Sequence, residues 1–228
     1  MEIIKLKLAL SNAYLVRGRK TILVDTGSPR EGMKILQALA RLSIEPKDFS
    51  LILHTHAHFD HAGSTLQLKH WINVPTAVHI KDSEMLARGR MNPLTPTSLE
   101  GRLVIPFVNR LFSGFKADIL INEEISLKEF GANGKVVFTP GHTAGSISVL
   151  LANGEAIVGD LMMGGSVGGN LFPSRPNYHY YADDLAQVRT SIKKLLDLKV
   201  KKLHVGHGGP LDAEAVKRYF SKDIQIQE

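Results

Sequence analysis

An apolar strand that runs directly into a cluster of metal-competent side chains is the feature that most limits how this chain can fold. Residues 51–53 are Leu-Ile-Leu, and histidine or aspartate then occupies positions 54, 56, 58, 60 and 61. His56 and His58 are two residues apart, so extended backbone would point both imidazoles to the same side. Asp60 and His61 follow where the chain turns toward a helix, and we expect them to face a neighbouring point. The sequence therefore predicts a polar site at the end of a buried strand.

The chain contains no cysteine and ten histidines. The absence of cysteine excludes a disulfide scaffold, a cysteine nucleophile, an iron–sulfur cluster and a thiolate zinc site. Any bound metal must therefore be held by nitrogen and oxygen, and imidazole with carboxylate suits zinc or iron. The length of 228 residues and the hydrophobic content of 43% are ordinary for one globular domain with a substantial core.

Three further apolar segments end in one metal-competent residue beside glycine. His142 follows Gly141, Asp160 follows Gly159, and His207 stands between Gly206 and Gly208. Glycine lets backbone approach a site closely, and functional residues often follow the ends of strands. We therefore expect these three side chains to complete the site that begins at residue 54.

Apolar patterning predicts regular elements on both sides of these motifs. Short apolar runs separated by turn signals make the first 25 residues a predicted β-meander. Two runs of strands, each followed by helices, favour packed sheets flanked by helices. We expect strands at 3–8, 13–16, 21–24, 49–53, 76–79, 118–121, 135–138, 146–150, 156–158 and 202–205, and helices at 30–42, 63–71, 83–88, 182–197 and 213–220.

Two segments do not follow this pattern. Residues 91–116 contain three prolines and an apolar, basic stretch, and we interpret them as an inserted element. Residues 164–168 match the pattern of a serine nucleophile elbow, but neither a strand directly before them nor a helix directly after them is predicted. We expect 164–168 to be a flexible glycine loop near the site.

These motifs resemble the metallo-β-lactamase-fold hydrolase superfamily. Residues 55–61 (Thr-His-Ala-His-Phe-Asp-His) match its T-H-x-H-x-D-H signature, and His142, Asp160 and His207 follow in the family's order. Residues 12–16 and 23–27 are similar to the early strands of its glyoxalase II-like and lactonase-like members. The resemblance spans nearly the whole chain, apart from 91–116 and about 162–181. It implies one domain over residues 1–228, folded as an α/β four-layer αββα sandwich of two mixed β-sheets flanked by helices.

The resemblance also implies a dinuclear metal site. His56, His58 and His142 would hold one divalent ion, Asp60, His61 and His207 the second, and Asp160 would bridge both beside a shared hydroxide. Zinc is the first choice, with iron or manganese as alternatives. The implied reaction is hydrolysis of an ester, thioester or lactone of a small, anionic or acyl substrate, with Asp60 and Asp160 as catalytic residues. Asp25 would hold a ligand histidine in place.

Other branches of the superfamily suggest different functions. Flavodiiron relatives carry glutamate where this chain has His58, which disfavours that redox branch. A mononuclear iron persulfide dioxygenase is the main alternative, and a nucleic-acid phosphodiesterase is a weaker one. Some lactonase members have a tyrosine three residues after the bridging aspartate, where this chain has Met163. Tyr178, Tyr180 or Tyr181 could substitute for it.

Substrate contacts are predicted from two aromatic segments. The polar aromatic cluster 177–181 supplies the candidates His179, Tyr178 and Tyr181, and the inserted segment supplies Phe107 and Arg110. The inserted segment has three interpretations: a lid over the site, a homodimer contact, or an amphipathic helix packed on the body. The remaining histidines, His54, His70, His79 and His204, are interpreted as packing residues.

The net charge of +6 and the pI near 9.5 are compatible with nucleic acid, anionic small molecules or simple solubility. The start of the chain alternates lysine with apolar residues, so we expect no secretory signal. No apolar stretch reaches the 18 or so residues of a membrane span. We expect a cytoplasmic enzyme with a small-molecule substrate, without a membrane or nucleic-acid partner.

Overall fold

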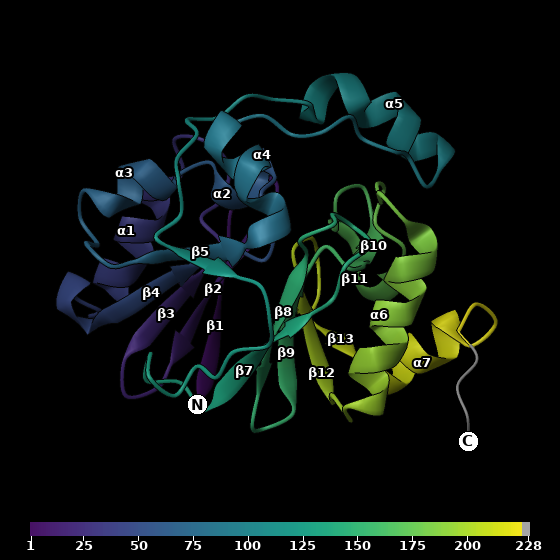
Figure 1. The fold of residues 1–228 in the computed structure, drawn as a ribbon. Helices are drawn as coiled ribbons and strands as arrows, with labels where there is room; N and C mark the ends of the chain where they lie inside the picture. The colour runs from purple at the N-terminus through teal and green to yellow at the C-terminus, as the bar shows by residue number, and fades with distance from the viewer. Residues whose placement is uncertain (225–228) are drawn as a thin grey trace.

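The computed structural model describes residues 1–224 and contains two mixed β-sheets packed between layers of helices (Figure 1). The first sheet has six strands in the order β1-β2-β3-β4-β5-β6, and the second has five in the order β13-β12-β9-β8-β7. The first comprises β1 (Glu2–Lys7), β2 (Asn12–Arg17), β3 (Thr21–Val24), β4 (Phe49–Leu53), β5 (Thr76–His79) and β6 (Ile119–Ile121). The second comprises β7 (Gly134–Phe138), β8 (Ile147–Leu151), β9 (Glu155–Gly159), β12 (Lys202–Val205) and β13 (Leu211–Asp212).

The core between the sheets follows from the alternation of side chains along each strand. In β3, Ile22 and Val24 face the second sheet, whereas Leu23 faces the helices that cover the first sheet. Residues of both sheets form the central core, including Tyr14, Leu51, Leu53, Val136, Val149 and Ile157. Because both faces of the central strands are covered, most of their residues are buried.

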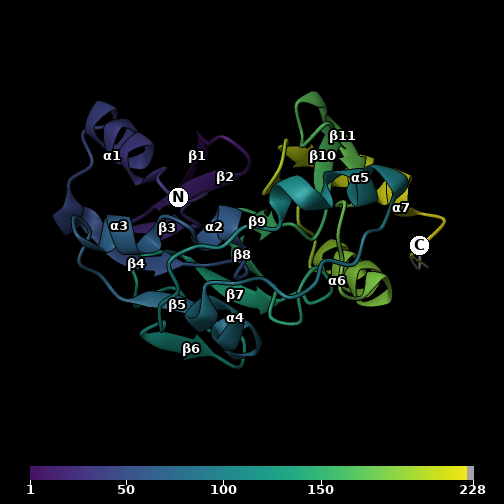
Figure 2. The same ribbon diagram turned by 90° about the horizontal axis from the view of Figure 1, so that it is seen from above.

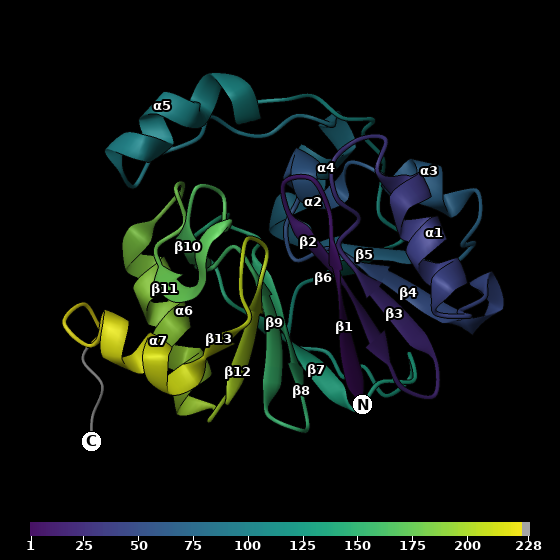
Figure 3. The ribbon, with the colours of Figure 1, turned by 180° about the vertical axis from the view of Figure 1, so that it is seen from behind.

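Helices cover the outer face of each sheet (Figures 2 and 3). Ile35 and Leu39 of α1 (Gly32–Arg41) and Leu68 of α3 (Thr65–Lys69) pack on the first sheet. Ile192 of α6 (Leu185–Asp197) and Val216 of α7 (Ala213–Phe220) pack on the second. The result is the expected αββα arrangement. Two short helices, α2 (Phe59–Ala62) and α4 (Ser83–Arg88), and 3-10 turns at Pro46–Asp48 and Ile80–Asp82 complete this part of the chain.

The inserted segment contains one helix, α5 (Leu99–Val108). This helix lies above the half of the molecule that contains the second sheet (Figure 1). Its first turn is capped by the Ser98 side chain, which accepts a hydrogen bond from the Gly101 backbone N–H. Ile105 and Val108 pack with Met163, Tyr180 and Tyr181. The opposite face is apolar but solvent-exposed, with Leu99, Leu103 and Phe107 exposed to 73%, 69% and 66%.

The structure corrects several sequence expectations. The predicted glycine loop is part of a β-hairpin, β10 (Met163–Ser166) paired with β11 (Leu171–Asn177). Glycine-rich β10 and proline-containing β11 have low strand propensity, and β11 is largely exposed, so apolar alternation is missing. The helix expected at 182–197 begins only at Leu185, because the Asp184 carboxylate caps it by accepting from the backbone N–H groups of Ala186 and Gln187. The helix expected at 63–71 is shorter, Thr65–Lys69.

Within residues 1–224 every helix is too short or too polar to span a bilayer.

Candidate metal centre

Ends of four strands bring the seven predicted ligands together. The first four follow β4, where His58 adopts an extended conformation at the start of α2 and Asp60 and His61 lie within that helix. His142 lies between β7 and β8, Asp160 follows β9 directly, and His207 lies two residues beyond β12. Four groups result whose ligand atoms lie within 4.8 Å of one another: His56, His58 and His142; His56, His61 and Asp160; Asp60, His61 and His207; and His142, Asp160 and His179. The fourth group includes His179, which the sequence predicted as a substrate contact and not as a ligand.

The polar atoms at the centre of this cluster fit bound cations. The Nε2 atoms of His56 and His61 and the Oδ1 atom of Asp160 are buried and have no hydrogen-bond partner within residues 1–224. The Nδ1 of His58 and the Nε2 of His142 face one another at 3.1 Å. Buried polar atoms are normally hydrogen-bonded, and converging imidazole nitrogens beside carboxylates are a donor set for zinc or a similar divalent ion. The residues present therefore fit the metal ions that the sequence predicts.

The other ring nitrogen of most of these histidines is held from outside the cluster. His61 Nδ1 lies 2.8 Å from Asp25 Oδ2, His142 Nδ1 lies 2.9 Å from the Tyr181 carbonyl, and His207 Nδ1 lies 2.9 Å from the Leu10 carbonyl. A partner of this kind orients the ring and fixes the tautomer so that the opposite nitrogen points at the metal. Each of these three rings therefore presents Nε2 to the centre.

Asp25 supports two parts of the site at once. Besides His61, its carboxylate accepts hydrogen bonds from the Thr55 backbone N–H and the Thr55 hydroxyl, both at 2.8 Å. Asp25 has a positive φ of 62°, a conformation that is uncommon for residues with a side chain. The predicted link between Asp25 and a ligand histidine is present in the structure.

Burial and neighbouring charges shift the pKa values of these groups in opposite directions. Burial lowers the pKa of His58 and of His142 to about 3, so both are neutral and able to bind metal. Burial also lowers the pKa of His61, but Asp160, Asp25 and Asp60 outweigh it and hold that pKa well above its ordinary value. The imidazoles around Asp160 likewise outweigh its burial and keep its pKa well below the usual range.

A close backbone approach explains the glycine before His207. A Cβ on Gly206 would overlap the Asp160 carboxylate and crowd the His61 ring. The Gly206 backbone N–H also donates to the Gly159 carbonyl at 2.6 Å, which ties the end of β12 to the end of β9. A side chain at this position would therefore displace the central carboxylate.

A buried carboxylate that the sequence reasoning missed joins the two ligand loops. Asp82 accepts hydrogen bonds from the Ala57 backbone N–H at 3.0 Å, the Thr143 hydroxyl at 2.8 Å and the Gly145 backbone N–H at 2.9 Å. These contacts connect the loop of His56 and His58 to the loop of His142. The sequence carried no signal for this role, because Asp82 lies outside every motif.

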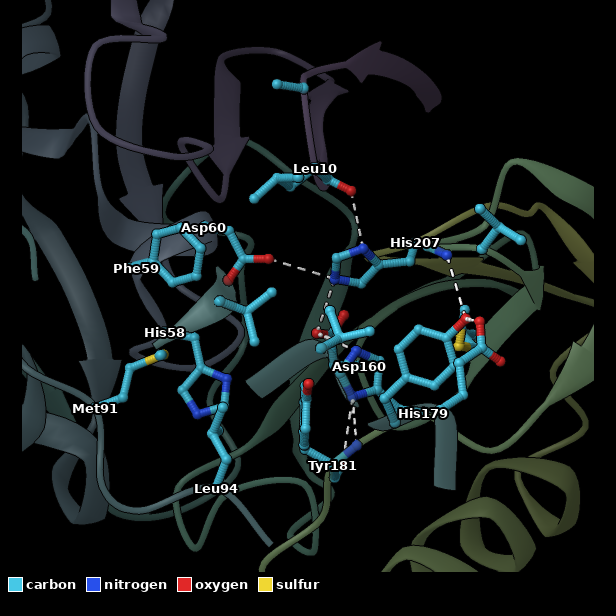
Figure 4. Close-up of a pocket in the computed structure, with 18 of the residues that line it drawn as sticks. Leu10, His58, Phe59, Asp60, Met91, Leu94, Asp160, His179, Tyr181 and His207 are labelled. Carbon is cyan, nitrogen blue, oxygen red and sulfur yellow. Dashed lines mark hydrogen bonds and ion pairs between the residues drawn. The ribbon is translucent and has the colours of Figure 1, made fainter. Parts of the chain in front are cut away.

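The centre opens into a cavity of about 290 Å³ that α5 helps to line. Figure 4 shows His58, Asp60, Asp160, His179 and His207 facing this cavity. Most of the remaining wall is apolar and comes from the inserted segment, the β10–β11 hairpin and the first loop, including Met91, Leu94, Val104, Val108, Met163, Val167 and Leu10. The cavity thus has a polar floor and an apolar wall.

The structure separates the five predicted substrate contacts into two groups. His179 and Tyr181 line the cavity, and the Tyr181 hydroxyl donates to the Gly101 carbonyl of α5 at 2.9 Å. Tyr178 instead packs against Phe220, with its hydroxyl 2.8 Å from Asp223. Phe107 and Arg110 lie on the exposed side of the inserted segment. Their contact with substrate stays a prediction from the sequence.

The histidines interpreted as packing residues lie outside the four ligand groups. His54 is buried with Nε2 at 3.2 Å from the Thr65 hydroxyl, His79 stacks on Phe138, and His204 Nε2 lies 2.6 Å from Glu155. His70 is exposed at the end of α3.

Comparison with known proteins agrees with this arrangement. The family model of the metallo-beta-lactamase superfamily matches residues 7–207. A probable metallo-hydrolase of Methanocaldococcus jannaschii is 34% identical over 203 residues, which cover 87% of each chain. A hydroxyacylglutathione hydrolase of Haemophilus influenzae is 27% identical over 83% of this chain and 81% of its own. The crystal structure of TTHA1623 in a di-iron-bound form superposes with a TM-score of 0.68 and 25% identity, covering 96% of this chain and 98% of that one.

Proposed function

The chain belongs to the metallo-beta-lactamase superfamily, and from this premise we propose that it is a dinuclear metal-dependent hydrolase of acyl esters, thioesters or lactones. The observation that carries the proposal is the convergence of seven metal-competent side chains on the floor of an apolar cavity. Several of them have buried atoms without a hydrogen-bond partner within residues 1–224. The site would take a small substrate whose reacting carbonyl faces the floor and whose acyl group faces the wall.

The ligand groups define which residues would hold each ion. His56, His58 and His142 form one group, and Asp60, His61 and His207 form the other. Asp160 Oδ2 lies 3.3 Å from His61 Nε2 and 3.6 Å from His142 Nε2, which suits a position shared by both groups. We propose zinc first, because its preferred ligands are neutral imidazole and carboxylate, while iron and manganese accept the same donors.

The protein's own groups would bind and orient the reactants. When bound, a pair of divalent ions supplies an activated water nucleophile and polarises the carbonyl. Asp60 lies with Oδ2 at 3.5 Å from His207 Nε2, at the cavity side of the centre, where its carboxylate can orient the attacking water. Leu94, Val104 and Val108 exclude water from the acyl group and favour an apolar chain.

Two observations on relatives support this choice of chemistry. One relative is named a hydroxyacylglutathione hydrolase, and the crystal structure of another contains two iron ions. Apolar residues on the cavity wall favour an acyl substrate over a nucleic acid, which would need basic groups beside the phosphates. The persulfide dioxygenase remains the alternative, and the metal count separates it from the hydrolase.

Elemental analysis of the purified protein, combined with an ester, thioester and lactone panel, tests the proposal. We expect about two ions per chain. His58→Ala should reduce the metal content and abolish hydrolysis, since His58 is a proposed ligand. The fold should remain, because His58 lies at the start of α2 and not within a helix or strand. The exposed His70 provides a matched control, because His70→Ala removes an imidazole without touching the site. One iron per chain, with oxygen consumed in the presence of a persulfide, would establish the alternative, and full activity of His58→Ala would contradict the metal site.

A further inference from the structure

A second cavity, which is polar, adjoins the cavity of the metal centre. It has a volume of about 140 Å³ and is lined by Lys5 and Lys7 of β1, by residues 168–170 at the tip of the β10–β11 hairpin, and by Gly208 and Gly209. We call it the β1 groove. The residues that line both cavities are Ala9, Leu10, Gly168 and Asn170. A Cβ on Gly168 would have the Asn170 amide at 4.0 Å as its nearest neighbour, so the boundary is open at that residue. A substrate bound at the metal centre is therefore within reach of the β1 groove.

Two lysines enter the β1 groove from the same side of one strand. Side chains two residues apart in a strand point the same way, and Lys5 and Lys7 alternate with Leu6, which packs on the helices of the first sheet. Lys5 Nζ donates to the Gly209 carbonyl at 3.1 Å, and Lys7 Nζ lies 3.5 Å from Asn170 Oδ1. The two ammonium groups thus lie together at the wall of the groove.

The positive charge of these two lysines is not balanced by the protein. Within residues 1–224 their hydrogen-bond partners are neutral carbonyl and amide oxygens, and neither lysine forms an ion pair. Partial burial, together with the nearby charge of Lys7, lowers the pKa of Lys5. An anion placed between the two ammonium groups would offset their repulsion and accept charge-assisted hydrogen bonds from both.

The cavity of the metal centre offers no comparable cation. Among the residues within 1–224 that line it, none is lysine or arginine, and Glu100 is the charged residue of its wall outside the ligand set. Most of the remaining wall is apolar. Burying a charge against apolar side chains is costly unless the charge is paired. A negatively charged part of the substrate would therefore be unfavourable beside α5 and favourable in the β1 groove.

We propose that the β1 groove binds an anionic group, a carboxylate or a phosphate, on the leaving group of the substrate. This inference rests on the proposed function, in which the acyl group contacts the apolar wall and the reacting carbonyl faces the metal centre. Hydrolysis breaks the bond between the carbonyl carbon and the sulfur or oxygen of the leaving group. Water supplies a hydroxyl group to the acyl product and a proton to the leaving group.

Leu10 connects the groove to the metal centre. Its carbonyl lies 2.9 Å from Nδ1 of the proposed ligand His207, as Figure 4 shows, and the residue lines both cavities. The chain beyond His207 continues to Gly208 and Gly209, which line the groove. The leaving group would therefore pass from the ligand His207 toward Lys5 and Lys7, and these lysines would select among leaving groups without touching the reacting atoms.

The test uses three butyryl thioesters that share an acyl group and differ in the leaving group: N-acetylcysteamine is neutral, glutathione carries carboxylates and coenzyme A carries phosphates. The double variant Lys5→Gln with Lys7→Gln removes both charges of the groove. Lys199→Gln with Lys201→Gln is the matched control, because these exposed lysines are also two residues apart but precede β12, at the opposite end of that strand from Gly208. Metal ions per chain, kcat and KM are measured on each metal-loaded protein. Calorimetry gives the Kd of the S-methyl thioether of each leaving group.

We expect the groove variant to raise KM for an anionic thioester, and the Kd of its S-methyl thioether, about tenfold, since charge-assisted hydrogen bonds to two lysines are lost. Its kcat, its metal content and its KM for the neutral thioester should equal those of the natural protein, and the control variant should change nothing. An effect confined to coenzyme A would identify phosphate as the bound group, and an effect confined to glutathione would identify carboxylate.

Two results would overturn the proposal. Equal losses for all three thioesters would show that the lysines only support the structure around the site, and unchanged KM and Kd for both anionic leaving groups would show that the groove binds no anion. Lys7→Gln alone keeps the test valid should the double variant fail to fold, because Lys7 is exposed. A natural protein that holds two ions but hydrolyses no ester, thioester or lactone would refute the proposed function, while the Kd values of the S-methyl thioethers would still decide whether the groove binds an anion.

Discussion

Asp25 Oδ2 lies 2.8 Å from His61 Nδ1, and this contact connects the first sheet to the metal centre. Asp25 follows β3 and His61 lies in α2, so two separate elements define the position of one ligand ring. The same carboxylate accepts two hydrogen bonds from Thr55, which precedes the ligand His56. The orientation of both proposed ligands therefore depends on Asp25.

Asp25→Asn should weaken binding of the ion at Asp60, His61 and His207 by about 10- to 100-fold, because the partners of ligand histidines orient the ring and raise its basicity. Competition with a chelator, followed by elemental analysis, measures the effect. Asp118→Asn is the control, since Asp118 is a hydrogen-bonded carboxylate at Lys69 and Thr76, away from the centre. Equal metal affinity in Asp25→Asn and the natural protein would contradict this role.

Gly206→Ala should reduce metal content and activity, because the new methyl group would overlap the Asp160 carboxylate. Gly134→Ala is a matched steric control: its methyl group would meet the Leu150 carbonyl within the second sheet. We expect both variants to lower the melting temperature, but only Gly206→Ala to lower the number of ions per folded chain. Normal metal content in Gly206→Ala would show that the carboxylate can move without loss of the site.

Neighbouring residues of α5 test the apolar wall. Val104 lines the cavity, whereas Leu103 is 69% exposed on the outer face. Val104→Trp should reduce kcat/KM for long acyl chains about tenfold or more and affect short chains little, since a pocket that loses space rejects each excess methylene. Leu103→Trp should leave the chain-length profile unchanged. A series of esters of increasing acyl length measures both, and parallel shifts in the two variants would argue against α5 as a pocket wall.

The metal-free protein should lose stability as the pH falls from about 6.5 to about 4. Burial lowers the pKa of His54 to about 4 and those of His58 and His142 to about 3, so these rings stay neutral in the folded state while the unfolded chain takes up protons. Asp82 opposes the trend, since burial raises its pKa to about 6 and its protonation favours the folded state in the same range. Because three histidines oppose this one carboxyl group, the net effect is a loss of stability.

Thermal melting of the chelated protein at several pH values measures this effect. His54 alone should contribute roughly 3 kcal/mol of lost stability by pH 4, because burial lowers its pKa from 6.5 to about 4. His54→Asn should flatten the pH dependence, and His70→Asn on the surface should not. A melting temperature that is constant over this range would be incompatible with neutral buried histidines.

Several strands that lead into the site were predictable because their signals are local. β3 (Thr21–Val24), β4 (Phe49–Leu53) and β12 (Lys202–Val205) have the predicted bounds, since short apolar runs with turn residues beside them report burial directly. The β10–β11 hairpin was not predictable. A Cβ on Gly164 would overlap the Pro173 carbonyl, so β10 pairs through glycines that carry no strand preference.

The sequence by itself determined which side chains can bind metal and in what order they occur, because ligand chemistry belongs to each residue and the spacing of His56, His58, Asp60 and His61 is local. Only the tertiary structure decided which of the aromatic and apolar candidates face the centre. It places His179 and Tyr181 at the cavity and leaves Phe107 exposed. The cavity wall joins residues near 10, 94–108 and 163–181, and segments this far apart in the chain meet only through packing, for which no local pattern exists.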